Sequence, residues 1–148
     1  MNTYEKSNSI ETVKLSHFSR KEYRAMLAAT ENIADRQKRA QTLCIYLSER
    51  FKVAVPVVKV VNRVQPHRTG YSGSLKSKIL GTYTPATQAI TLYNLTAIKK
   101  QVVSIKQMTA TLLHEYIHHY DVTVLKFGTS PHTAGFYKRI SDLESKLK

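Results

Sequence analysis

The stretch that most constrains this chain is the run 112–119, which contains the motif His-Glu-x-x-His at His114, Glu115 and His118. On an α-helix, residues four positions apart lie on the same face, so both imidazoles can point at one metal ion. Glu115 then projects beside them, where it can take a proton from a metal-bound water. Imidazole is a good zinc ligand, and catalytic zinc sites keep one position open for water. The motif therefore predicts a zinc site with Glu115 as its general base.

The residues around the motif indicate a buried helix and argue against a chance match on a solvated one. Ser104 followed by Gln107 has the pattern of a capping box at a helix start, and Gly128 fits the stop position. No Lys or Arg occurs between Lys106 and Lys126. Apolar side chains recur at helical spacing between these limits: Ile105, Met108, Leu112, Leu113, Tyr116, Ile117, Tyr120 and Val124. The motif should thus lie in the middle of a core helix.

A firm zinc site needs a third protein ligand, and His132 is the next candidate along the chain. Thirteen residues separate it from His118, enough to finish the helix, turn and return. Pro131 predicts the first turn of a further helix. The apolar stripe of that helix has helical spacing: Phe136, Ile140, Leu143 and Leu147. A His at this helix start can face the metal while the stripe packs on the motif helix.

Two carboxylates compete with His132 for this role. Asp121 lies seven residues after His114, on nearly the same helical face, and we favour it as a partner that orients an imidazole. Glu144, on the final helix, would make the site resemble that of a gluzincin. Peptide hydrolysis also needs an oxyanion donor besides zinc. The sequence leaves four candidates open: Tyr71, His119, Tyr120 and Tyr137. His119 receives no ligand role, because adjacent helical residues point about 100° apart.

The motif, the spacing to His132, and the positions of Phe136 and Lys138 after it resemble the SprT-like metalloprotease family, which includes the Spartan proteases. The resemblance covers the last third of the chain well and the preceding hairpin loosely. It implies a zincin-like minimal metalloprotease domain, three zinc-binding His, a catalytic Glu, and hydrolysis of protein or peptide substrates. Thr133 departs from the Gly that often follows the third His. The single Cys also excludes the Cys-rich zinc ribbon of several members, so the family's role in DNA repair does not follow automatically.

The chain carries 23 Lys and Arg against 10 Asp and Glu, a net charge of +13 at neutral pH. Such a charge attracts polyanions, of which nucleic acid is the commonest in a cytoplasm. The basic residues are spread out, with one small cluster at Arg36, Lys38 and Arg39. A solvated basic surface explains them equally well. The competing function is a non-catalytic nucleic-acid-binding domain, which needs a basic element with aromatic residues for stacking, and the sequence shows no such element.

Length and cysteine content favour one domain in a reducing compartment. A chain of 148 residues can bury a core without disulfides, and its only cysteine, Cys44, lies on an apolar helical face. Residues 1–13 are polar and lack the features of a secretory signal. No apolar run approaches the roughly 20 residues of a membrane span. We therefore expect a cytoplasmic protein with a polar, loosely docked tail over residues 1–18 and a single domain over residues 19–148.

The first part of this domain predicts helices followed by a strand. Ser19 with Glu22 has a second capping-box pattern. Apolar residues then recur at helical spacing as far as Phe51, in one long helix or in two with a break near residues 30–35. The β-branched run over residues 53–64 predicts a strand covered on both faces.

The middle of the chain predicts a loop and a hairpin. Residues 65–74 have the composition of a loop, from which His67 and Tyr71 can approach a substrate. Residues 75–93 predict a β-hairpin with its turn at 84–88. One of its strands should border the active-site cleft, where an unfolded peptide can pair with the exposed edge. The whole pattern predicts an α+β fold: N-terminal helices, a small, mostly antiparallel sheet, the motif helix and a C-terminal helix.

Overall fold

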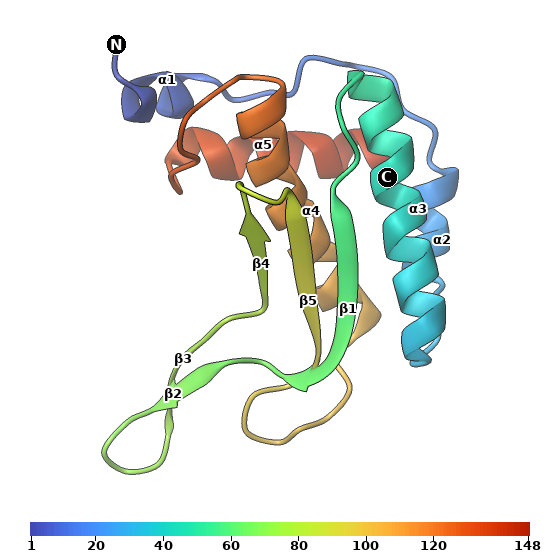
Figure 1. The fold of residues 1–148 in the computed structure, drawn as a ribbon, viewed down its shortest axis with the longest axis vertical. Coiled ribbons are helices and arrows are strands. Elements are labelled where there is room, and N and C mark those ends of the chain that lie inside the picture. Colours follow the sequence, from blue (N-terminus) through green and yellow to red (C-terminus); the bar gives the residue numbers. More distant parts are fainter.

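The computed structural model describes residues 1–148 and confirms an α+β fold, with helices at both ends of the chain and strands between them (Figure 1). The helices are α1 (Thr3–Ser9), α2 (Lys21–Leu27), α3 (Ile33–Phe51), α4 (Ile105–Thr123) and α5 (Ala134–Leu147). The strands are β1 (Val57–Val64), β2 (His67–Thr69), β3 (Leu75–Lys78), β4 (Gly81–Thr84) and β5 (Ala89–Leu95). None of the helices has the length and apolar character needed to cross a membrane.

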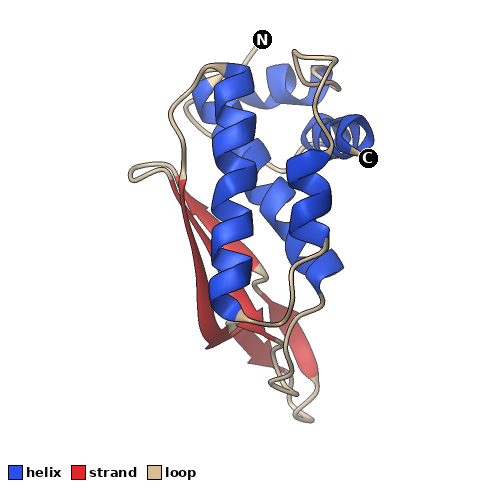
Figure 2. Cartoon of the chain, turned by 90° about the vertical axis from the view of Figure 1, so that its right-hand side faces the viewer, coloured by secondary structure: helices blue, strands red, loops and turns tan.

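The main sheet has the strand order β1-β5-β4, and the helices lie against one of its faces (Figure 2). β4 pairs antiparallel with β5, as the hairpin prediction requires. β1 pairs parallel with β5, so the sheet is mixed and the prediction of a mostly antiparallel sheet is wrong for its longest pair. The chain leaves the sheet after β1, passes through β2 and β3, and returns to the sheet as β4. The reversal from β4 to β5 then makes β5 run parallel to β1.

β1 is an edge strand with only one covered face, so the prediction of two covered faces is wrong. Val58 and Val60 are buried, whereas Val57 is 52% exposed and Lys59 points away from the core. A run of Val residues has the same β-propensity whether or not a second layer covers it. The helices cover only one side of this sheet, which the local sequence could not reveal.

The hairpin is shorter than predicted, because its expected beginning belongs to another pair of strands. Leu75–Lys78 pairs antiparallel with His67–Thr69. His67–Thr69 lies inside the stretch that the sequence predicts to be a loop. Residues 67–78 form a two-stranded projection, here called the arm, which extends away from the main sheet (Figure 1). Gly73 has a φ of +80°, which L side chains rarely adopt, and allows the turn at its tip.

The N-terminal helices contain the predicted break. α2 and α3 are separate, and the Asn32 side chain caps α3 by accepting a hydrogen bond from the Asp35 amide at 3.0 Å. The predicted capping box at the start of α2 is not formed, because the N-cap position is Arg20. The Ser19 hydroxyl instead accepts from the Lys21 amide, two residues ahead.

The motif helix α4 begins as predicted and ends earlier. The Ser104 hydroxyl accepts from the Gln107 amide at 3.2 Å. The helix ends at Thr123, so the expected stop at Gly128 is wrong; Lys126, with a φ of 59°, supplies the left-handed residue in the turn that follows. α5 begins at Ala134, so the prediction that Pro131 lies in its first turn is wrong. The side chain of Thr133 caps the helix by accepting a hydrogen bond from the Phe136 amide.

Residues 1–18 do not form the loosely docked tail that their polar composition predicted. They contain α1, the buried Ser7, and Val13, which belongs to the hydrophobic core. The Val13 amide donates to Asp142, and the Lys14 amide donates to the hydroxyl of Tyr120. Polar contacts to α4 and α5 hold this segment in place. Such contacts leave no apolar periodicity in the sequence, so the sequence did not predict them. The core itself lies between the sheet and α3, α4 and α5, and includes the fully buried Cys44.

Candidate metal centre

Three imidazoles from two parts of the chain meet at one point. His114 and His118 project from adjacent turns of α4, and His132 comes from the loop immediately before the N-cap of α5. One potential ligand atom from each of the three residues lies within 4.8 Å of the other two. Nε2 of His118 and Nε2 of His132 lie 3.0 Å apart. The three His residues are therefore placed to bind a metal ion.

Phe136 fixes the orientation of these rings by packing. It is fully buried on the first turn of α5. Its ring stacks on His118 with a centroid distance of 4.5 Å, and meets His114 edge-on at 5.1 Å and His132 at 5.2 Å. The second helix therefore contributes both a packed support for the rings and, just before its start, the third imidazole.

Glu115 lies in a protected position beside this cluster. Its side chain is buried, with only 6% of the residue exposed, and burial raises the pKa of its carboxyl to about 7. Burial, followed by the neighbouring charge of His132, lowers the pKa of His114 to about 4. Burial and the two other imidazoles lower the pKa of His118 to about 3. At neutral pH both helix imidazoles are thus in the uncharged form that binds metal ions.

A cleft of about 400 Å³ ends at His114 and Glu115. One wall is the N-terminal half of α4, and the other is formed by residues 78–81, where the arm leads into β4. β4 is an edge strand, paired with β5 on one side only. Its first residue, Gly81, lines the cleft.

Gly81 allows β4 to approach the motif helix closely. A Cβ at this position would lie 2.8 Å from Thr111 Cγ2 and 2.9 Å from the Thr91 carbonyl oxygen. Real Cβ atoms do not approach other atoms so closely, so any other residue would force the strand away from α4. Thr111 lies one turn before His114 and Glu115. The glycine therefore brings the edge strand to within a helical turn of the imidazole cluster.

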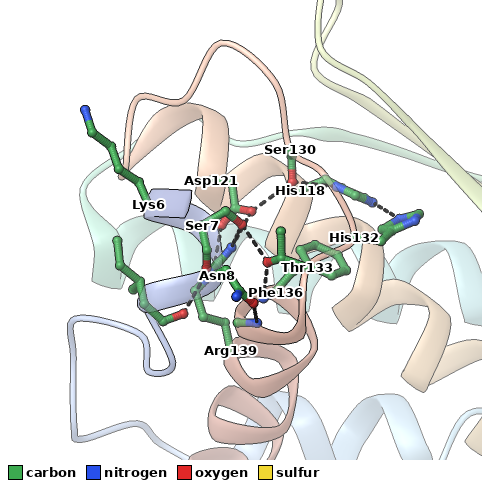
Figure 3. A network of polar contacts seen from close by, with 12 residues as sticks. Lys6, Ser7, Asn8, His118, Asp121, Ser130, His132, Thr133, Phe136 and Arg139 are labelled. Carbon is green, nitrogen blue, oxygen red and sulfur yellow. Dashed lines mark hydrogen bonds and ion pairs between the residues drawn. The ribbon is translucent and has the colours of Figure 1, made fainter. Parts of the chain in front are cut away.

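Asp121 is close to the site but does not contact an imidazole directly. Its Oδ2 accepts a hydrogen bond from the Ser130 hydroxyl at 2.8 Å, and the Ser130 Oγ lies 2.7 Å from Nδ1 of His118 (Figure 3). Asp121 is fully buried and forms an ion pair with the equally buried Arg139. Asp121 thus reaches His118 only through an intermediate serine, and it is not in the group of neighbouring ligand atoms.

Glu144, the other proposed alternative to His132, does not lie with the imidazole cluster. It sits near the opposite end of α5, where its carboxylate pairs with Lys148 at 3.1 Å. It is also absent from the group of ligand atoms that lie within 4.8 Å of one another. The gluzincin arrangement therefore has no geometric support.

Of the four oxyanion candidates, only Tyr137 lies beside the imidazoles. Its ring centroid is 5.9 Å from that of His132 and 6.1 Å from that of His114, and the residue is half-exposed. Tyr120 is buried, and its hydroxyl accepts from a backbone amide in the N-terminal segment. His119 is buried between the Tyr83 hydroxyl and a backbone carbonyl. Tyr71 is fully exposed on the arm, and His67 is exposed on β2.

Three residues at the site were missed in the sequence. Tyr83 of β4 lies nearly parallel to His118 at 6.5 Å, and burial raises the pKa of its hydroxyl to about 12. Ser130 contacts His118, and Arg139 neutralises Asp121. Only Arg139 had a recognisable signal: it occupies a position three residues after Phe136, within the apolar stripe of the last helix.

Comparison of the chain with protein-family models, with curated proteins and with solved structures finds no match.

Proposed function

We propose that this chain is a zinc-dependent endopeptidase of the SprT-like type, with His114, His118 and His132 as ligands and Glu115 as general base. The observation that carries the proposal is the convergence of three imidazoles beside a buried carboxyl at the end of a cleft. β4 is an edge strand that begins at this cleft with Gly81, and its unpaired edge suits an extended peptide. The same combination of motif helix, edge strand and third ligand supports a zincin-like interpretation of the fold.

The imidazole cluster fits zinc in chemistry and in scale. Tetrahedral zinc holds imidazole nitrogens at about 2.0–2.1 Å, which places the nitrogens roughly 3.3 Å from one another. The Nε2 atoms of His118 and His132 are 3.0 Å apart, and all three ligand atoms lie within 4.8 Å of one another. Small rotations of the exposed His132 ring can bring the nitrogen separations to the values that tetrahedral zinc requires. Three neutral nitrogen ligands leave a fourth position open, as catalytic zinc sites do.

Each part of the site has a separate chemical task. Bound zinc would polarise the scissile carbonyl and lower the pKa of the attacking water. Glu115 would accept the proton of the attacking water and deliver it to the leaving amine, a role for which a carboxyl with a raised pKa is well matched. The backbone of β4 pairs with the substrate and aligns it along the cleft. Tyr137 is the hydroxyl best placed to donate to the developing oxyanion.

Zinc content and hydrolysis should disappear together when one helix ligand is removed. We expect stoichiometric zinc by elemental analysis of the wild-type protein and none in His114→Ala. Cleavage of an unfolded, fluorescently labelled protein should follow the metal content and stop on chelation. Efficient cleavage by His114→Ala, or zinc-loaded wild-type protein that cleaves no peptide, would refute the proposed reaction.

A second proposal concerns the charge distribution, which is uneven along the chain. No Asp or Glu occurs between Glu49 and Glu115, while ten basic residues lie in the same interval. They are Arg50, Lys52, Lys59, Arg63, Arg68, Lys76, Lys78, Lys99, Lys100 and Lys106. This interval contains both sheets, so most of the net charge belongs to that part of the molecule.

The arm combines exposed cations with an exposed aromatic ring. Arg68, Lys76 and Lys78 are exposed on its two strands, and Tyr71 is fully exposed on the connecting turn. Pairing of β2 with β3 thus creates the basic element with an aromatic residue that the linear sequence did not show. We propose that the arm contacts nucleic acid through phosphate pairing and base stacking, as an accessory to peptide hydrolysis.

Neutralising the arm should weaken binding of single-stranded DNA specifically. For the triple variant Arg68→Ser, Lys76→Ser, Lys78→Ser we expect the salt dependence of log K to fall by about 2, because each phosphate contact contributes roughly 0.7. The matched control replaces exposed cations of the same types on α2 and α3: Lys21→Ser, Arg24→Ser, Lys38→Ser. Equal losses in both variants, measured by fluorescence anisotropy, would reduce the arm to part of a general basic surface.

A further inference from the structure

Arg139 connects the N-terminal segment to the interior beside the metal centre. Its side chain is fully buried, and each of its five N–H groups has an acceptor. Nε and one Nη2 hydrogen go to the two carboxylate oxygens of Asp121, at 3.1 and 2.8 Å. The other three go to the carbonyl oxygen of Ser7 at 2.6 Å, that of Ile10 at 2.5 Å, and the Ser7 hydroxyl at 3.0 Å. Most of the guanidinium is therefore satisfied only while the N-terminal segment is docked.

The hydrogen bonds beyond Asp121 determine which nitrogen of His118 carries its proton. An ionised carboxylate only accepts, so the Ser130 hydroxyl must donate to Asp121. The Ser130 oxygen then accepts from Nδ1–H of His118, 2.7 Å away. His118 is thereby held in the tautomer whose Nε2 lone pair faces His132 and the metal position.

A second set of contacts connects the same segment to the third imidazole. The Ser7 hydroxyl lies 2.9 Å from the hydroxyl of Thr133, the residue that follows His132 and caps α5. The α1 backbone also lies directly on Gly135, where an added Cβ would meet the carbonyl oxygens of Ser7 and Asn8 at 2.2 and 2.8 Å. Figure 3 shows both sets of contacts converging on Ser7.

We propose that residues Ser7–Ile10, here called the N-terminal brace, position two of the three imidazoles of the metal centre. Through Arg139, Asp121 and Ser130 the brace positions His118, and through Thr133 it positions the chain that carries His132. This inference rests on the metal site of the proposed function and adds positioning residues to it. Partners that orient zinc-bound imidazoles commonly contribute about 10–100-fold to metal affinity.

The first test replaces Ser130, the one residue that touches His118 in this network. Ser130→Ala should weaken zinc binding by about 10–100-fold in a competition titration with a chelator, while Ser130→Thr, which keeps the hydroxyl, should restore it. The visible spectrum of the cobalt-substituted protein should change in the Ala variant and recover in the Thr variant. A purely structural role would alter the melting temperature and leave the cobalt spectrum unchanged. Equal affinity and spectra for all three proteins would overturn the His118 part of the proposal.

The second test displaces the brace without altering any polar side chain. Gly135→Ala should force α1 off α5, expose the trypsin site after Lys6, and weaken zinc binding by a similar factor. Gly128→Ala is the matched control, because a Cβ there meets nothing within 4 Å. If Gly135→Ala does not fold, Ser7→Ala takes its place, since it removes one partner each from Arg139 and Thr133. A released N-terminal segment with wild-type zinc affinity and cobalt spectrum would overturn the brace.

Both tests measure metal binding without a substrate, which separates this inference from the proposed reaction. Zinc-loaded wild-type protein that hydrolyses no peptide would refute the reaction and leave the affinities of the variants interpretable. Unchanged affinities in variants of an active enzyme would refute the brace alone.

Discussion

Glu115→Gln is expected to retain zinc and to hydrolyse peptides about 10²–10⁴-fold more slowly than the wild-type protein, the usual contribution of a general base. Gln has the shape of Glu and cannot accept the proton of the attacking water. The three imidazoles are unchanged, so the zinc content should equal that of the wild type. Initial rates on an unfolded protein substrate, normalised to bound zinc, measure the effect.

This substitution should leave the fold intact, which makes the loss of activity interpretable. Burial raises the pKa of Glu115 to about 7, well above its usual value. Between the usual pKa of a Glu carboxyl and about 7, Glu115 is protonated in the folded protein and ionised in the unfolded chain. The free energy of unfolding of the metal-free protein therefore falls as the pH rises through this interval. Gln removes this penalty, so the melting temperature of the metal-free variant at pH 8 should not fall.

Glu144→Gln provides the matched control, because it makes the same chemical change at a carboxylate paired with Lys148 and remote from the imidazoles. Its activity and zinc content should equal those of the wild type. A Glu115→Gln protein that cleaves peptides at close to the wild-type rate would exclude Glu115 as the general base.

The second large effect is expected at His132. We predict that His132→Ala loses most of its zinc on dialysis and all of its activity, with an affinity reduced by more than the roughly 100-fold of an orienting partner. The two remaining imidazoles cannot supply the three protein ligands of a catalytic zinc site. His132 is exposed and lies on a loop, so its removal creates no core cavity. Circular dichroism and the melting temperature should therefore remain close to those of the wild type.

The Glu144→Ala variant should retain zinc, because the carboxylate of Glu144 lies away from the three imidazoles. The pair of variants decides between the two third ligands that the sequence left open. If Glu144→Ala loses the metal and His132→Ala retains it, the ligand assignment is wrong and the gluzincin arrangement replaces it.

The sequence by itself determined the features that depend on neighbours within a few residues. Helical periodicity and the Ser104 cap located α4, and the spacing of four residues placed His114 and His118 on one face of it. The alternation in β5 and the turn before it identified the β4–β5 hairpin. These patterns are reliable because side-chain direction in a helix or strand follows from backbone geometry alone.

Only the tertiary structure decided how separate segments meet. His132 reaches the helix imidazoles because α4 ends at Thr123 and the chain turns through the left-handed Lys126, whereas the sequence pointed to Gly128. The sequence of β1 also could not show that helices cover only one face of this strand.

The N-terminal segment shows this limit most clearly. Its composition is polar, and its docking depends on Arg139, which lies more than a hundred residues away along the chain. The sequence predicts that Asp121 lies near an imidazole, but it does not reveal the intervening Ser130 or the buried ion pair with Arg139. Hydrogen bonds between distant residues leave no periodic trace in a sequence, and their partners are known only once the chain is folded.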